Sequence, residues 1–264
     1  MPLYVRAPRR TQGPPFIGCR RHELLPLLRE RADRPLYAMR GHTYVACAAC
    51  GSARLDPLPD DEPADLYGAG YFVGGEDRGG YVDYEADEAI HRRNADARLR
   101  LVASALPARG RDAVAVGCAS GYVLDAYRDA GFVAHGVDVS PWARDRAAAC
   151  GHDVHATLKG ALAASSDLRV VSFFQVLEHL TDPDAALGEA AAALSPGGLL
   201  VVETWDLGSR VARLSGARWH QANPPSVLHL FTRTGLGELA DRHGVRVERL
   251  AATSKLVTLV AVKR

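Results

Sequence analysis

Residues 113–122 have the sequence AVAVGCASGY, in which a short apolar run leads directly into a turn of small residues. The apolar run, residues 113–116, is typical of a parallel strand that is covered on both faces. Residues 122–130 are predicted to form a helix, and Gly131 stands where a left-handed residue would end it. The stretch therefore predicts strand, tight turn and helix, with free N–H groups at the start of the helix that suit an anionic ligand.

The rest of the chain repeats this design. Ser140 and Pro141 suit the N-cap and first position of a second helix, which Gly151 would close. Such alternation predicts an α/β fold with a parallel sheet between helices, and ligands at the carboxyl ends of its strands. The functional loops should follow Val116, Val137, Phe174 and Glu203. The predicted strands are residues 113–116, 133–138, 153–155, 170–174, 199–203, 245–250 and 256–262, and the predicted helices are residues 87–106, 122–130, 141–150, 183–194 and 232–243.

Composition sets broad limits on the protein. The chain has 264 residues, with 32 Lys and Arg against 31 Asp and Glu, which gives a net charge of +1. This balance lacks the strong field of a general nucleic-acid or membrane-surface binder. No apolar run approaches the roughly 20 residues that a membrane helix needs, and neither a secretory signal nor an even cysteine count is present. We therefore expect a cytoplasmic protein that binds neither membrane nor nucleic acid.

Motif spacing narrows the ligand. Gly117, Ala119 and Tyr122 occupy the three positions of G-x-G-x-x-G, so the dinucleotide pattern fails twice. The spacing of Gly117, Ala119 and Gly121 instead resembles motif I of class I S-adenosylmethionine (SAM)-dependent methyltransferases. Downstream, the segments FQVLEHLTDP (174–183), LSPGGLL (194–200) and PPSVLHLFT (224–232) also resemble segments of this superfamily.

The resemblance implies a Rossmann-like, doubly wound, seven-stranded and mostly parallel sheet. It assigns the glycine turn to the methionine end of SAM and Asp138 to the ribose. Asp138 could equally cap the helix that starts at Ser140, and the glycines could be structural. Ala115 stands where the family usually has an acidic residue, and we hypothesise that Asp112 or a tyrosine compensates. The predicted SAM contacts are Tyr71, Tyr84, Gly117, Ala119, Gly121, Asp138, Val139 and Gln175.

Two histidines are candidates for the base that removes a proton from the methyl acceptor. His179 and His229 both fall on predicted loops at the ligand end of the sheet. Histidine suits this task because its unperturbed pKa lies near neutrality. Either side chain could instead simply cap or pack its own loop.

The N-terminal segment is a separate predicted module, residues 1–85, ahead of a methyltransferase domain at residues 86–264. Its pairs Cys19-x-x-His22 and Cys47-x-x-Cys50 suit a tetrahedral structural Zn²⁺ site, and the second pair resembles a zinc-ribbon knuckle. Unpaired thiols are the alternative. A run of tyrosines follows, which the resemblance implies is a lid over SAM, and ordinary aromatic packing of the module is the alternative.

Together these observations predict a SAM-dependent methyltransferase with structural Zn²⁺, monomeric or homodimeric, that acts on a small metabolite. The acceptor would be a hydroxyl, carbon or nitrogen, in natural-product or sugar biosynthesis. The alternatives are a catalytically silent SAM-fold binding subunit and a zinc-ribbon RNA methyltransferase. An oxidoreductase with the same fold is disfavoured by the glycine spacing.

Overall fold

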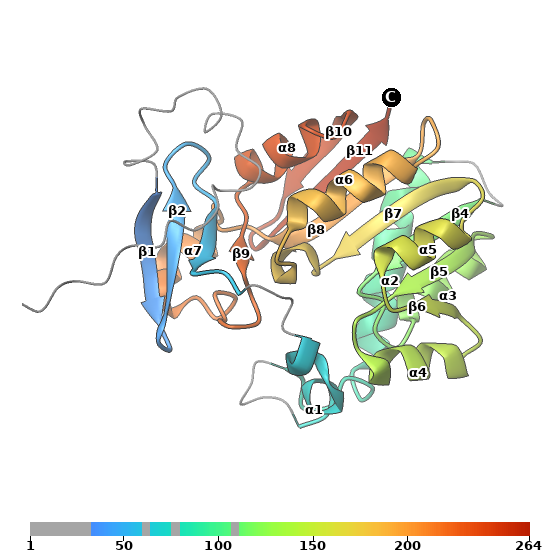
Figure 1. The fold of residues 1–264 in the computed structure, drawn as a ribbon, viewed down its shortest axis with the longest axis horizontal. Coiled ribbons are helices and arrows are strands. Elements are labelled where there is room, and N and C mark those ends of the chain that lie inside the picture. The colour runs from blue at the N-terminus through green and yellow to red at the C-terminus, as the bar shows by residue number, and fades with distance from the viewer. Residues whose placement is uncertain (1–32, 60–63, 75–79, 107–110) are drawn as a thin grey trace, which may run out of the picture.

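The computed structural model describes residues 33–59, 64–74, 80–106 and 111–264, which form two sheets (Figure 1). The larger sheet has seven strands in the order β10-β11-β8-β7-β4-β5-β6. Its four central pairings, from β6 to β8, are parallel, whereas β11 runs antiparallel to both β8 and β10. The strands are β4 Asp112–Val116, β5 Val133–Val137, β6 Asp153–His155, β7 Leu168–Phe174, β8 Leu199–Trp205, β10 Val245–Ala252 and β11 Leu256–Lys263.

Helices cover both faces of this sheet. One apolar cluster joins α5, α6 and α8 to the sheet, and a second joins α2 and α3 to the opposite face. The prediction of a Rossmann-like, doubly wound, mostly parallel seven-stranded sheet is therefore confirmed. The helices are α1 Ala69–Phe72, α2 Glu88–Ala105, α3 Tyr122–Asp129, α4 Pro141–Ala149, α5 Leu158–Ala164, α6 Pro183–Ala193, α7 Arg210–Ser215 and α8 Arg233–Asp241.

The smaller sheet was not predicted. It is antiparallel, in the order β1-β2-β3-β9, and it combines the N-terminal residues with a strand from far along the chain. Its strands are β1 Asp33–Met39, β2 His42–Cys47, β3 Ala53–Asp56 and β9 His229–Leu230. Buried Tyr44 donates from its hydroxyl to the carbonyl of Val227 at 2.6 Å, which ties the two segments together.

The segment 204–231, for which no helix or strand was predicted, therefore contains structure. It holds α7, which Ser209 caps by accepting from the N–H of Ala212, and it ends in β9. The sequence also missed α5, which Thr157 caps in the same way. Short elements of this kind carry too few residues to show a period. The proposed division at residue 85 remains a prediction, and the β3–β9 pairing runs across it.

None of the helices in the described part of the chain combines the length and apolar character needed to cross a membrane.

Candidate functional site

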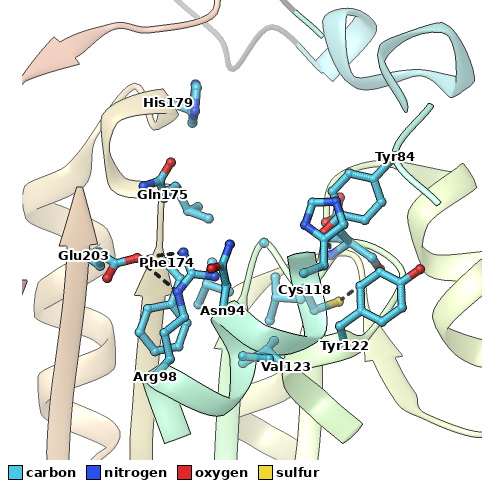
Figure 2. Close-up of a pocket in the computed structure, with 18 of the residues that line it drawn as sticks. Tyr84, Asn94, Arg98, Cys118, Tyr122, Val123, Phe174, Gln175, His179 and Glu203 are labelled. Atoms are coloured by element: carbon cyan, nitrogen blue, oxygen red, sulfur yellow. Dashed lines mark hydrogen bonds and ion pairs between the residues drawn. The ribbon is translucent and has the colours of Figure 1, made fainter. Parts of the chain in front are cut away.

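A cavity of about 580 Å³ opens at the carboxyl ends of β4, β5, β7 and β8 (Figure 2). Its size is within the range of small-molecule sites, and its position is the one expected for a ligand of an open α/β sheet. Eight residues predicted as SAM contacts or as the base line it. They are Tyr71, Tyr84, Gly117, Ala119, Asp138, Val139, Gln175 and His179.

The turn after β4 is held tightly against the loop after β7. Gly117 has φ +68°, and a Cβ at this position would lie 2.2 Å from Cγ2 of Val176. Ala119 and Gln175, one on each loop, also have positive φ angles of 48° and 62°. Non-glycine residues in this conformation are uncommon and collect at ligand sites. The backbone strain in the two loops therefore supports a functional cavity.

Asp138 connects the turn to the next strand. Its carboxylate accepts from the N–H of Ala119 and from the N–H of Ser140, both at 2.9 Å. Burial raises the pKa of the Asp138 carboxyl, and these two hydrogen bonds act against that rise. Asp138 therefore anchors the residue that caps α4 and also lines the cavity, and its contact with a ribose remains a prediction. A ligand hydroxyl would meet a carboxylate already fixed in orientation.

Gly121 is the predicted SAM contact that the structure does not bring to the cavity. It has φ +94°, and a Cβ here would lie 2.7 Å from Cδ2 of His152. Gly121 is thus required by the turn and by packing against His152, which agrees with the alternative that this glycine is structural.

Aromatic side chains close one side of the cavity. The ring of Tyr84 stacks on His91 at 4.0 Å, and His91 stacks in turn on Tyr122 at 5.7 Å. The N–H of Tyr81 donates to the carbonyl of Tyr71 at 2.7 Å, which holds the tyrosine segment together. Burial raises the pKa values of the Tyr71 and Tyr84 hydroxyls, so both remain neutral.

His179 faces the cavity in a defined tautomer. It ends the short 3₁₀ turn Leu177–His179 that follows β7. Its Nδ1 lies 2.6 Å from the carbonyl oxygen of Ser226. A carbonyl can only accept a hydrogen bond, so Nδ1 carries the proton and Nε2 of the neutral ring keeps a free lone pair. The loop that holds Ser226 thereby fixes the orientation of the His179 ring, as a general base requires.

His229, the second candidate base, is not among the cavity residues. It lies in β9, is 4% exposed and stacks on Phe231 at 5.9 Å. Burial lowers the pKa of the His229 imidazole to about 4. This position contradicts a role as general base and matches the packing alternative.

A charged pair that was not predicted from the sequence lies on the cavity wall. Arg98, from α2, donates from Nε and Nη2 to Oε1 of Glu203 at 3.0 and 2.7 Å, and its guanidinium lies over the ring of Phe174. Figure 2 shows the pair beside the Gln175 loop. Neither residue belongs to a local motif, so only the packing of α2 against the end of β8 brings them together.

The proposed compensation for Ala115 by Asp112 is wrong. Ala115 is 1% exposed and packs in the core. Asp112 begins β4, at the opposite end of the strand from the cavity, and its Oδ2 accepts from the N–H groups of Ser166 and Asp167. Tyrosines do line the cavity, and Glu203 adds a second carboxylate there beside that of Asp138.

The structure places half of the predicted zinc ligands. Cys19 and His22 lie outside the described residues. Cys47 and Cys50 are buried at the two ends of a tight turn, in which the N–H of Gly51 donates to the carbonyl of Cys47 at 2.9 Å. A hydrogen bond with Cys47 and burial raise the pKa of the Cys50 thiol. Two adjacent buried thiols fit half of a tetrahedral site, and the zinc itself remains a prediction.

A seven-stranded sheet with one antiparallel strand, a glycine turn after β4 and an acidic residue after β5 defines the fold of class I SAM-dependent methyltransferases. Residues 86–250 match the family described as "Methyltransferase domain", and the chain therefore belongs to it.

Two curated proteins named ubiquinone biosynthesis O-methyltransferase are similar in sequence. The one from Bradyrhizobium sp. (strain ORS 278) is 35% identical over 97 residues, and the one from Rhodopseudomonas palustris (strain BisA53) is 29% identical over 150 residues. The matches cover 34% and 53% of this chain but only 38% and 58% of those proteins.

Among solved structures, magnesium protoporphyrin IX methyltransferase from Synechocystis PCC 6803 with bound S-adenosylhomocysteine (SAH) superposes with a TM-score of 0.56. It is 15% identical, and the match covers 74% of this chain and 97% of that one. At this identity the likeness supports the fold alone.

Proposed function

We propose that this protein transfers the methyl group of SAM to a hydroxyl of a small molecule, with His179 as the general base. The observation that carries the proposal is the hydrogen bond from Nδ1 of His179 to the carbonyl of Ser226, which makes Nε2 the nitrogen with a lone pair in the neutral form of this cavity residue. The two curated relatives are named as O-methyltransferases, which supports oxygen as the acceptor. The proposal includes the predicted role in natural-product or sugar biosynthesis.

The cavity wall offers partners for the methionine end and the ribose of SAM. The small-residue turn at Gly117 lets backbone approach the methionine end, and the fixed carboxylate of Asp138 can accept from the ribose hydroxyls. The Arg98–Glu203 pair presents one positive and one negative group, which suits the carboxylate and ammonium of the methionine end.

The chemistry requires little more than position. A sulfonium methyl is already activated, so transfer needs the acceptor oxygen held in line with it and its proton removed. In this chain the tyrosine-lined wall would exclude water, and Nε2 of His179 would take the proton. The Arg98 and Glu203 charges would fix the end of the cofactor that does not react.

The experiment compares His179→Ala with His220→Ala, an exposed histidine that does not line the cavity. SAH binding is measured by calorimetry, and methyl transfer is measured over a panel of small phenols, alcohols, amines and carbon acids. We expect the wild type and both variants to bind SAH equally. Transfer to a hydroxyl should fall about 10²- to 10⁴-fold in His179→Ala, the usual contribution of a general base.

Two results would overturn parts of the proposal. Undiminished transfer by His179→Ala would remove the base assignment while leaving the methyltransferase intact. SAH binding without transfer to any acceptor would instead favour the silent binding subunit.

A further inference from the structure

Two histidines and an aspartate lie together at the outer edge of the larger sheet, apart from the cavity. His135 is in β5, and Asp153 and His155 are in β6, the last strand of the sheet. His135 pairs with Asp153 in the parallel register, and Asp153 and His155 are two positions apart on one strand. All three side chains therefore point to the same face. None of them lines the cavity.

The ligand atoms are close enough to share one ion. Nδ1 of His135 lies 2.7 Å from Oδ2 of Asp153, and Nε2 of His155 lies 3.2 Å from the same oxygen. One ligand atom from each of the three residues lies within 4.8 Å of the others. Ligands about 2.0–2.1 Å from a tetrahedral Zn²⁺ are roughly 3.3 Å apart, so the trio needs only small side-chain adjustments.

The three side chains differ in their exposure to solvent. The His135 side chain is 8% exposed, that of His155 is 24% exposed and that of Asp153 is 55% exposed. The buried imidazole would be the fixed ligand. An ion could enter from the open side, and water could complete its coordination there.

A second carboxylate stands behind the buried histidine. Asp112 uses Oδ2 to accept from Ser166 and Asp167, and its Oδ1 lies 4.0 Å from Nε2 of His135. That Nε2 is shielded from solvent and has no hydrogen bond within the described residues. Metal-bound histidines commonly direct the opposite N–H to a carboxylate, which fixes the tautomer. With Nδ1 on a metal, the proton on Nε2 would face Asp112.

Carboxylates lie on both sides of the His135 ring. Asp153 lies at Nδ1 and Asp112 lies toward Nε2. An ion held at Nδ1 would place the ring between the metal and an outer carboxylate, so that both ring nitrogens face a suitable partner.

We propose that His135, Asp153 and His155 bind one divalent transition metal ion, with Asp112 as the outer partner of His135. Two imidazoles and one carboxylate favour Zn²⁺ over Mg²⁺ or Ca²⁺. The ion would join the edge strand β6 to β5. This site shares no residue with the cysteine site predicted near the N-terminus, and it does not depend on methyl transfer.

The test uses the full chain with Cys47→Ser and Cys50→Ser, which removes the two described thiols of the predicted cysteine site from competition. The metal-free protein is titrated with Zn²⁺ by calorimetry and with Co²⁺ by absorption spectroscopy. We expect one ion per chain and a cobalt spectrum without a thiolate charge-transfer band. His155→Ala, at a partly exposed position, should weaken binding at least about 100-fold, and Asp112→Asn about 10- to 100-fold.

His220→Ala, a matched exposed histidine, should leave the affinity unchanged. If the cysteine variant does not fold, the same comparison of His155→Ala with His220→Ala is made in the wild-type chain, where the cobalt bands separate thiolate from imidazole ligation. Equal affinity of His155→Ala and its parent, or no thiolate-free ion, would overturn the proposal and leave a hydrogen-bonded His-Asp-His group.

Discussion

The loop after β7 and the strand β9 are neighbours that place their histidines in opposite environments. The N–H of Leu228, next to His229, donates to the carbonyl of Glu178, next to His179, at 2.8 Å. One histidine lines the cavity with a fixed tautomer, and the other is sealed in the protein with its pKa lowered to about 4.

The difference shows what a histidine needs in order to act as a base. Both residues sit in motifs of the same superfamily and at the same end of the sheet, so residue type and motif do not separate them. What separates them is the side of the backbone on which each imidazole lies. His179 keeps one nitrogen accessible, whereas His229 is enclosed and stacks on Phe231.

The largest expected effect comes from moving the His179 loop. Gly117→Ala would place a Cβ against Val176, two residues after the strand end and three before His179, and would force an unfavourable φ. Gly244 has the same φ of +68° with open space around it. We expect Gly244→Ala to lose about 1 kcal/mol of unfolding free energy from strain alone, and Gly117→Ala a further 1–3 kcal/mol from overpacking.

Urea unfolding of the two glycine variants measures this difference, and SAH calorimetry shows whether the cavity is affected. Gly117→Ala should lose SAH affinity and Gly244→Ala should not. Equal losses of stability would mean that the two loops are not packed as described.

The next largest effect is a loss of unfolding free energy at low pH, and we expect His229 to cause it. Its imidazole has a pKa of about 4 in the fold against about 6.5 in an unfolded chain. Between these pH values the unfolded state binds the extra proton, so stability falls as the pH drops. The full difference is worth roughly 3 kcal/mol. Urea unfolding at pH 7 and pH 4.5 should show a smaller acid loss in His229→Gln than in the wild type.

Identical pH dependence in the two proteins would place His229 in contact with solvent. His179→Gln serves as the matched variant in the neighbouring loop, and it should retain the acid loss that His229 causes.

A third effect separates the cavity from its surroundings through two aspartates. Asp138→Ala removes a carboxylate that lines the cavity and holds Ala119, and we expect SAH affinity to fall about 100-fold. Asp182 instead caps α6 by accepting from the N–H of Ala185 and does not line the cavity. Asp182→Ala should cost about 1 kcal/mol of stability and leave SAH affinity unchanged. Calorimetry that found the reverse pattern would refute the assignment of Asp138.

The sequence predicts most where the structure is local. The strand, turn and helix around Gly117 and the cap at Ser140 follow from neighbouring residues, and the structure has them where they were predicted. The smaller sheet could not be predicted, because β9 contributes two residues whose partner lies about 175 positions earlier. Arg98 and Glu203 were missed for the same reason. His179 and His229 were found together, but only packing could tell them apart.

The smallest effect lies on the boundary between the two regions, at Glu178. This residue is 1% exposed, and its carboxyl oxygens are shielded from solvent. Burial raises the pKa of the Glu178 carboxyl, against the opposing influence of His179 and the Thr204 hydroxyl. The fold therefore holds its proton to a higher pH than the unfolded chain does, and stability falls as the pH rises through the folded-state pKa.

Glu178→Gln keeps the size of the side chain and removes its ionisation. We expect the variant to unfold like the wild type at pH 4 and to be more stable by about 1 kcal/mol at pH 8, because the folded wild type must then either bury a charge or keep a proton that the unfolded chain releases. Urea unfolding at both pH values measures the difference. Methyl transfer should be unchanged, since Glu178 does not line the cavity. A variant less stable than the wild type at pH 8 would show that the ionised carboxylate, rather than the neutral acid, joins the two loops.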